Sequence, residues 1–182
     1  KGEGLGNQFL GHIREVDAVA YVLRCFVDDD ITHVENRIDP IADAEVVETE
    51  LMLSDLESLE KRRLPLEKKA KGGDKEAKAQ LAIIDKALPL LREGKPARLT
   101  EVTPEELPLF RQLQLLTSKP VLYVCNVDEA SAANGNQFSK KVEELARAEG
   151  AGCVVISAKI ESEFASLAAE GRAEFLAEMG LE

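Results

Sequence analysis

The segment 120–157 reads PVLYVCNVDEASAANGNQFSKKVEELARAEGAGCVVIS and carries the pattern that decides the fold. Its two ends, 120–127 and 153–157, are short, β-branched and almost continuously apolar, as parallel strands covered on both faces tend to be. Between them the apolar residues follow helical spacing, and Gly150 lies where a left-handed residue would end a helix. The segment therefore predicts a strand, a helix and a second parallel strand, joined by a right-handed crossover.

A third apolar run, AVAYVLRCF at 18–26, predicts another strand of the same sheet, although Arg24 interrupts it. Strands that alternate with helical patterns are typical of α/β folds. The three cysteines lie within these apolar runs, and their spacing matches no zinc or redox motif. We therefore expect an α/β core with a parallel sheet, with Cys25, Cys125 and Cys153 as buried free thiols.

The sequence pattern of residues 40–116 predicts helices. Pro40 fits the first turn of a helix, Asp74 is a good N-cap for a second helix after a Gly-Gly turn, and Thr103 opens a capping box before a third. The second helix has apolar residues spaced 4, 3, 4, 3, the seam spacing of a coiled coil. These residues are Ala77, Leu81, Ile84, Leu88 and Leu91. Pro65 and Pro89 are expected to kink the two arms of this antiparallel hairpin.

The sequence thus predicts two parts. Residues 1–39 and 117–182 form the α/β core, and residues 40–116 form a helical coiled-coil insertion between its first and second strands. No run of about 18 apolar residues occurs, so no membrane span is expected. No secretory leader is recognisable either, which favours a cytoplasmic location. We expect a monomer.

Charge is distributed unevenly along a chain whose net charge is −11. Residues 28–60 contain twelve acidic side chains and a single Arg, whereas residues 61–78 contain eight basic and three acidic ones. The basic far end of the hairpin is either an ordinary solvated tip or a surface that binds phosphate groups of RNA or the ribosome. Its candidate residues are Lys68, Lys69, Lys71 and Lys75.

Polar residues follow the second and third predicted strands at their carboxyl ends, where ligands bind in open α/β sheets. Asn126-Val127-Asp128-Glu129 offers an amide and a carboxylate that can hold a purine edge, and the tripeptide 157–159 can offer a backbone N–H. Either motif alone is more often an ordinary strand-to-helix turn. Together, on successive strands, they favour base recognition. The candidate residues are Asn126, Val127, Glu129, Ser157, Ala158 and Lys159.

Several features of the chain resemble the YchF/Obg-like ATPases, a branch of the P-loop nucleotide hydrolases. The opening 1–26 is similar to the family's segment after its DxxG motif, and DDDITHV at 28–34 followed by Asp39-Pro40 is similar to its next stretch. The Lys-Gly-Gly-Asp turn at 71–74 and the TSKP run at 117–120 also have counterparts. The resemblance covers essentially the whole chain.

The resemblance implies a partial G-domain-like core. GTPases of this superfamily use NKxD, and here Val127 replaces the Lys and Glu129 replaces the Asp, which implies a preference for ATP with tolerance of GTP. It also implies Mg²⁺ and a phosphate-binding loop upstream of Lys1, a TGS domain downstream of Glu182, and association with ribosomes or RNA. No GxxxxGK[ST] motif occurs in the chain, so no catalytic or metal-binding residue is assigned and no hydrolysis by the chain alone is expected.

The glycines of the opening loop, Gly2, Gly4 and Gly6, would relay the state of the phosphates as part of a mobile switch. The roles of His33 and the aspartates 28–30 stay open, with a structural role favoured over catalysis or metal binding. Two alternative functions remain. One is a GTP-specific regulatory GTPase, and the other is a non-catalytic adaptor that binds the ribosome or RNA through the helical arm.

Overall fold

The computed structural model describes residues 3–28 and 37–181. By its internal contacts the chain forms two compact units. Unit 1 comprises residues 1–19 and 46–120, and unit 2 comprises residues 20–45 and 121–182. The predicted division into 1–39 with 117–182 and 40–116 stays a prediction, because compactness alone does not define a domain boundary.

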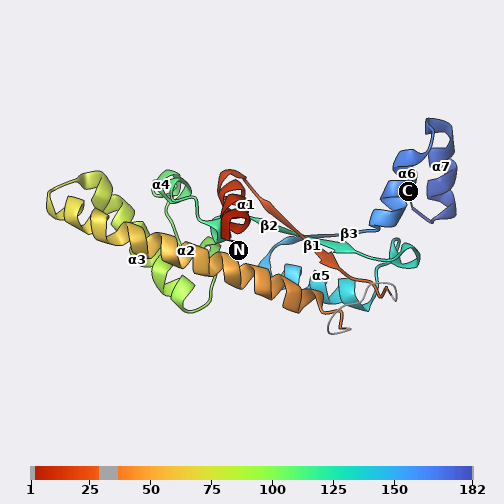
Figure 1. Cartoon of the computed structure of the whole chain (residues 1–182), viewed down its shortest axis with the longest axis horizontal. Helices are drawn as coiled ribbons and strands as arrows, with labels where there is room; N and C mark the ends of the chain where they lie inside the picture. The colour runs from red at the N-terminus through yellow and green to blue at the C-terminus, as the bar shows by residue number, and fades with distance from the viewer. Residues whose placement is uncertain (1–2, 29–36, 182) are drawn as a thin grey trace. The chain divides into compact units, whose positions relative to one another are not determined.

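The sheet of unit 2 has the predicted α/β character (Figure 1). Its strands are β1 (Val19–Arg24), β2 (Val121–Asn126) and β3 (Gly152–Ile156), in the order β1-β2-β3. β2 and β3 pair in parallel, with Asn126 opposite Ile156. The Cys25 N–H donates to the Asn126 carbonyl at 2.8 Å, so the carboxyl end of β1 lies beside that of β2. All three predicted strands are confirmed.

Helix α5 (Gln137–Glu149) connects β2 to β3 and packs against both strands, as predicted. It ends at Gly150, whose φ of 67° is the left-handed conformation expected of a C-cap glycine. Tyr123 on β2 donates its hydroxyl to Glu149 at 2.7 Å and meets Tyr21 of β1 edge to face. Tyr21 and Tyr123 therefore lie on the face of the sheet that α5 covers.

The opposite face of the sheet differs from the expectation of strands covered on both sides. Val22, Leu122 and Val154 are 67%, 37% and 42% exposed. Because successive side chains of a strand point to opposite faces, α5 covers one set of side chains and leaves the alternate set open. After β3, α6 (Ala158–Ser166) and α7 (Ala169–Glu178) continue the chain, and Phe164 contacts Phe175 between them.

The predicted helical hairpin is confirmed, and its residues 46–92 belong to unit 1 (Figure 1). Helix α2 (Pro40–Lys71) is followed by a turn and by α3 (Lys75–Arg92). Asp74 caps α3, accepting from the Glu76 and Ala77 N–H groups at 3.0 and 3.1 Å. Leu59 of α2 packs among Ile83 and Ile84 of α3 in a shared apolar core. Both helices continue through their prolines.

The chain returns from the hairpin through three short helical segments. These are η1 (Ala97–Leu99), α4 (Leu107–Gln112) and η2 (Leu116–Ser118). The predicted capping box exists, since Thr103 and Glu106 exchange hydrogen bonds at 3.1 and 3.3 Å, but it closes a turn. The helix itself begins only at Leu107, one turn later than predicted, and is six residues long.

Helix α1 (Glu3–Glu15) corrects the expected mobile loop at the start of the chain. Gly4 and Gly6 lie within this helix, so the described backbone there is helical rather than a glycine-rich loop. Gly2 and His33 lie outside the described residues, as do two of the three clustered aspartates. In the described parts of the chain, no helix is long and apolar enough to cross a membrane.

Candidate functional site

The carboxyl ends of β2 and β3 bring the two predicted motifs of unit 2 into contact. Asn126 is the last residue of β2, and its side-chain Oδ1 accepts a hydrogen bond from the Ala158 N–H at 3.0 Å. The Val127 N–H donates to the Ile156 carbonyl at 2.8 Å, which extends the pairing one residue past the strand. The amide of one motif therefore touches the backbone of the other, as a common base slot requires.

The bond to Ala158 also settles how the amide of Asn126 is oriented. A backbone N–H can only donate, so the atom that faces Ala158 must be the amide oxygen. The Asn126 Nδ2 group then points elsewhere, and it has no hydrogen-bond partner among the residues that the structure describes. This strand end therefore presents a hydrogen-bond donor of fixed orientation.

Ser157 and Val127 occupy different positions from those that an open slot would give them. Ser157 is the N-cap of α6, accepting from the Ile160 N–H at 3.4 Å, and is only 3% exposed. Val127 is likewise 3% exposed, so its side chain belongs to the core. Their side chains stabilise the turn and leave backbone groups for a ligand, the kind of group that the tripeptide 157–159 was expected to offer.

Glu129 and Lys159 face each other across the same strand ends. The Lys159 Nζ lies 2.5 Å from Glu129 Oε1, and the two side chains are 71% and 36% exposed. The hydrogen bond and the charge of Glu129 raise the pKa of the Lys159 ammonium above its ordinary value. Lys159 therefore stays protonated, and it neutralises part of the carboxylate that was predicted to accept from a base.

The sequence did not lead us to expect a role for Asn136 at the strand ends. Asn136 donates from Nδ2 to the Cys25 carbonyl at the end of β1, at 2.6 Å. Its Oδ1 caps α5 by accepting from the Phe138 and Ser139 N–H groups at 3.0 Å. The signal was present in the sequence, because Asn136 and Ser139 form a capping box just ahead of a helical apolar pattern.

The three thiols lie side by side across the sheet, as free cysteines. Cys125 Sγ is 3.8 Å from Cys153 Sγ, and Cys25 also hydrogen-bonds to Cys125. Burial raises the pKa of Cys153 to about 12, and contact with Cys25 raises that of Cys125 further. A raised pKa lowers the thiolate fraction, so Cys125 and Cys153 are poor nucleophiles. The hydrogen bond with Cys125 instead lowers the pKa of Cys25. Cys25 and Cys125 are buried as predicted, whereas Cys153 is only partly buried.

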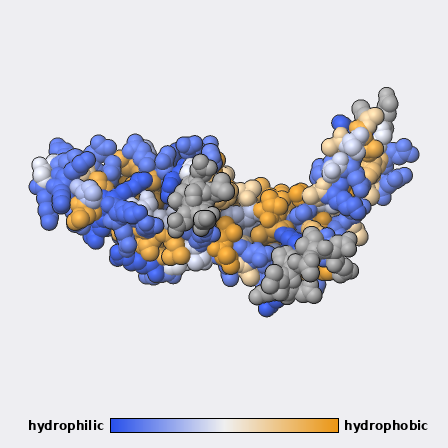
Figure 2. All heavy atoms as spheres, in the orientation of Figure 1, coloured by the Kyte–Doolittle hydropathy of each residue, from blue (hydrophilic) through white to orange (hydrophobic). Residues whose placement is uncertain are grey.

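The far end of the α2–α3 hairpin in unit 1 carries the predicted basic group. We call the exposed lysines around the turn 72–74 the arm tip. They are Lys68, Lys69, Lys71 and Lys75. None of these four forms an ion pair within the described residues, whereas Lys61 and Arg63 pair with acidic neighbours. Figure 2 shows hydrophilic residues over most of this end of the hairpin.

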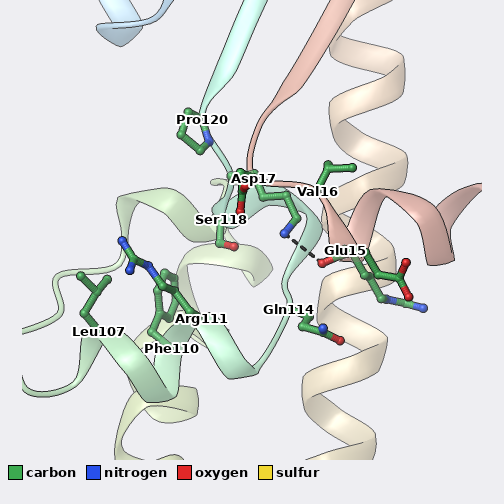
Figure 3. Close-up of a pocket in the computed structure, with 11 residues that line it drawn as sticks. Glu15, Val16, Asp17, Leu107, Phe110, Arg111, Gln114, Ser118 and Pro120 are labelled. Carbon is green, nitrogen blue, oxygen red and sulfur yellow. Dashed lines mark hydrogen bonds between the residues drawn. The ribbon is translucent and has the colours of Figure 1, made fainter.

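Unit 1 also contains a depression of about 660 Å³ that none of the predicted site residues lines (Figure 3). Its walls come from the end of α1 and the two residues after it, from α4 and from residues 114–120. Lys119 donates to the Arg14 carbonyl at 3.0 Å across it. Gln114 at its edge has a φ of 51°, a conformation that residues other than glycine seldom adopt.

In the described parts of the chain, no group of three or more metal-ligating side chains is placed to hold a metal ion. Asp28 is among the described residues, whereas Asp29 and Asp30 lie outside them.

No family model matches the chain. The chain is 48% identical over its whole length to the ribosome-binding ATPase YchF of Bacillus subtilis and 46% identical to the protein of the same name in Escherichia coli O157:H7. A solved structure described as the YchF GTPase of Schizosaccharomyces pombe matches 98% of the chain with a TM-score of 0.83 and 32% identity. The chain spans about half the length of each of these proteins.

Proposed function

Because the chain belongs over its whole length to the YchF family, we propose that the complete protein binds and hydrolyses ATP, and GTP more weakly. In this proposal it is a monomeric, cytoplasmic regulatory hydrolase that associates with the ribosome. Residues 1–39 and 117–182 supply the purine-recognition end of the nucleotide-binding core, and residues 40–116 supply the arm. The observation that carries the proposal is the bond between Asn126 and Ala158, which joins the two candidate motifs.

The base lies at the carboxyl ends of β2 and β3 in this proposal. Asn126 donates from Nδ2 to a ring nitrogen of the purine, because its Oδ1 is held by Ala158. Lys159 places its methylene stem along the ring, and Glu129 meets the outer edge of the base. Val127 and Ser157 position this turn from below. Because the Ala158 N–H is already bonded, any backbone N–H offered to the base belongs to another residue of the turn.

The phosphates and Mg²⁺ are held by residues outside this chain in the proposal, since the 182 residues contain no GxxxxGK[ST] motif. Mg²⁺ bound with the triphosphate would neutralise charge that develops during phosphoryl transfer. The residues of this chain orient the base and thereby the nucleotide. We expect the isolated chain to bind nucleotide weakly and to leave it unhydrolysed.

Competition between adenine and guanine nucleotides tests the base assignment. Full-length protein is loaded with a fluorescent ATP analogue, and unlabelled ATP or GTP is titrated against it in the presence of Mg²⁺. We expect ATP to displace the probe at lower concentration than GTP. Tighter GTP binding would favour a GTP-specific enzyme instead, an interpretation that the name of the Schizosaccharomyces pombe structure supports.

The arm tip is the proposed contact with the ribosome, because its four lysines have no acidic partner among the described residues and phosphate groups can fill that role. The test reverses the charges of Lys68, Lys69 and Lys71 and measures co-sedimentation of the full-length protein with ribosomes at several salt concentrations. Reversal of Lys140, Lys141 and Arg147, which are exposed on α5, is the matched control. If both variants sediment as the wild type does, the tip is ordinary solvated surface.

A further inference from the structure

A buried carboxylate on α2 binds the segment that leads into β2. Asp55 is 2% exposed, yet its two oxygens accept three hydrogen bonds within unit 1. The Leu116 N–H donates to Oδ1 at 2.7 Å, the Thr117 N–H to Oδ2 at 2.8 Å, and the Thr117 hydroxyl to Oδ2 at 2.6 Å. The backbone at η2 is thereby fixed to one position along the arm helix.

A second set of bonds ties η1 to the same place. The Thr117 hydroxyl also accepts from the Ala97 N–H at 2.8 Å. Arg98 donates to the Thr117 carbonyl at 2.9 Å and pairs with Glu48 of α2. Glu48 and Asp55 are seven residues apart, so they lie on the same side of the helix, two turns from each other. Two points of the arm therefore hold the returning chain.

The apolar packing of the hairpin does not require this network. Leu59 and the buried residues of α3 join the two helices through an apolar core, which also includes Ala97 and Leu115 of the returning chain. A carboxylate removed from water is costly even when it is well hydrogen-bonded, and such networks commonly define one arrangement of their elements more than they add stability. Asp55 adds polar contacts that fix one position of residues 116–117 along α2.

That register matters because the base-recognition strand lies directly downstream of it. β2 begins at Val121, four residues after Thr117, and ends at Asn126. A movement of the arm that pulls on Thr117 therefore acts on the start of the strand whose other end carries the proposed base contact. A strand is stiff along its length, so a displacement at one end is carried toward the other.

We propose that Asp55 and Thr117 are positioning residues that couple the arm to the base-recognition strand. This inference rests on the proposed function, because it concerns how that nucleotide site is regulated. Nucleotide binding at the strand end changes the mobility of the arm through the Asp55–Thr117 contact. If nucleotide changes the affinity of the arm for a partner by some factor, that partner must change the affinity for nucleotide by the same factor.

The test compares Thr117→Val with Thr117→Ser in the full-length protein. Val has the shape of Thr but loses both hydroxyl hydrogen bonds, whereas Ser keeps them. Nucleotide affinity is measured by calorimetry with a non-hydrolysable ATP analogue and Mg²⁺. Hydrogen exchange of α2 and α3, the helical hairpin of the arm, is measured by mass spectrometry with and without that analogue.

We expect the wild type and Thr117→Ser to change arm exchange on binding the analogue, by about fivefold or more in rate, a factor typical of coupled sites. Thr117→Val should bind the analogue within about threefold of the wild type and lose that response. A wild-type protein that binds nucleotide without any response in the arm overturns the inference, and so does a Thr117→Val variant with a full response.

Two further outcomes are separated by the same measurements. If calorimetry detects no binding to the wild type, the proposed function itself fails, and the inference fails with it. If Thr117→Val does not fold, Arg98→Met replaces it, because that change removes the outer bonds to Glu48 and the Thr117 carbonyl and leaves the buried carboxylate satisfied. A partial loss of the arm response is then expected, and an unchanged response overturns the inference.

Discussion

Replacing Asn126 by Ala tests the candidate site at its central contact. The substitution removes the oxygen that accepts from the Ala158 N–H at 3.0 Å, and it removes the Nδ2 donor as well. The backbone of residue 126 keeps its bonds, because its carbonyl accepts from Cys25 and the strand pairing involves main-chain groups only. The change therefore affects the side-chain contact and leaves the sheet intact.

The expected magnitudes follow from that geometry. One neutral hydrogen bond at a partly exposed strand end contributes about 0.5–1.5 kcal/mol to the free energy of unfolding. A donor to the base that is lost from the bound state costs about 1–3 kcal/mol, and displacement of the turn at Ala158 adds to it. We therefore expect nucleotide affinity to fall about 10-fold to 100-fold in Asn126→Ala, with only a small loss of stability.

Asn136→Ala is the control, measured by calorimetric nucleotide binding and urea unfolding of full-length protein. Asn136 caps α5 with two accepted bonds and donates to Cys25, so its loss costs about 1–2 kcal/mol of stability. It is at least as destabilising as Asn126→Ala, and yet it should keep nucleotide affinity within about twofold. Wild-type affinity in Asn126→Ala, or an equal loss in both variants, would refute the reasoning.

Three further predictions concern stability and reactivity. Burial raises the pKa of Asp55 above its ordinary value of 3.8 although three donors oppose the shift, so proton uptake favours the folded state. Urea unfolding of wild type and Asp55→Asn at a series of pH values measures this effect. The difference in free energy of unfolding should favour wild type most below pH 3.8 and should decrease as the pH rises through the raised pKa of Asp55. Leu59→Ala should lower the free energy of unfolding by about 2–5 kcal/mol in the same assay, since Leu59 is fully buried. Cys153, whose pKa is raised to about 12, should carry roughly a thousandfold less thiolate than an ordinary cysteine and be alkylated by iodoacetamide only after unfolding, as mass spectrometry of the labelled protein would reveal.

Local signals in the sequence predicted most of the secondary structure. The strand–helix–strand segment, the cap at Asp74 and the C-cap at Gly150 all depend on residues within a few positions of one another. The buried face of α3 was predicted less well. Ile83 and Ala87 are buried in addition to the expected seam, and Leu81 of that seam is only partly buried. A coiled-coil seam covers one partner only, whereas α3 also packs against α4 and η1 and needs a wider apolar face.

The parts of the structure that sequence could not predict depend on distant residues. Asp55 reads as one more acid on an acidic helix, and its partners Leu116 and Thr117 are 61 and 62 residues away. The open face of the sheet was missed because apolar alternation does not say which faces other elements cover. At the strand ends, the pattern did not reveal that the Ser157 side chain caps α6, because that role depends on where the helix begins.

The two polar contacts at the strand ends divide the work of base recognition in the proposed function. Adenine and guanine both present N7 as an acceptor, so a donor such as Asn126 Nδ2 holds either purine and does not discriminate between them. Discrimination then depends on Glu129, since guanine offers ring and amino N–H groups to a carboxylate. Lys159 already occupies Glu129 at 2.5 Å, which weakens its attraction for those groups. A site of this kind accepts adenine without loss and guanine at a disadvantage, which is the preference proposed for the complete protein.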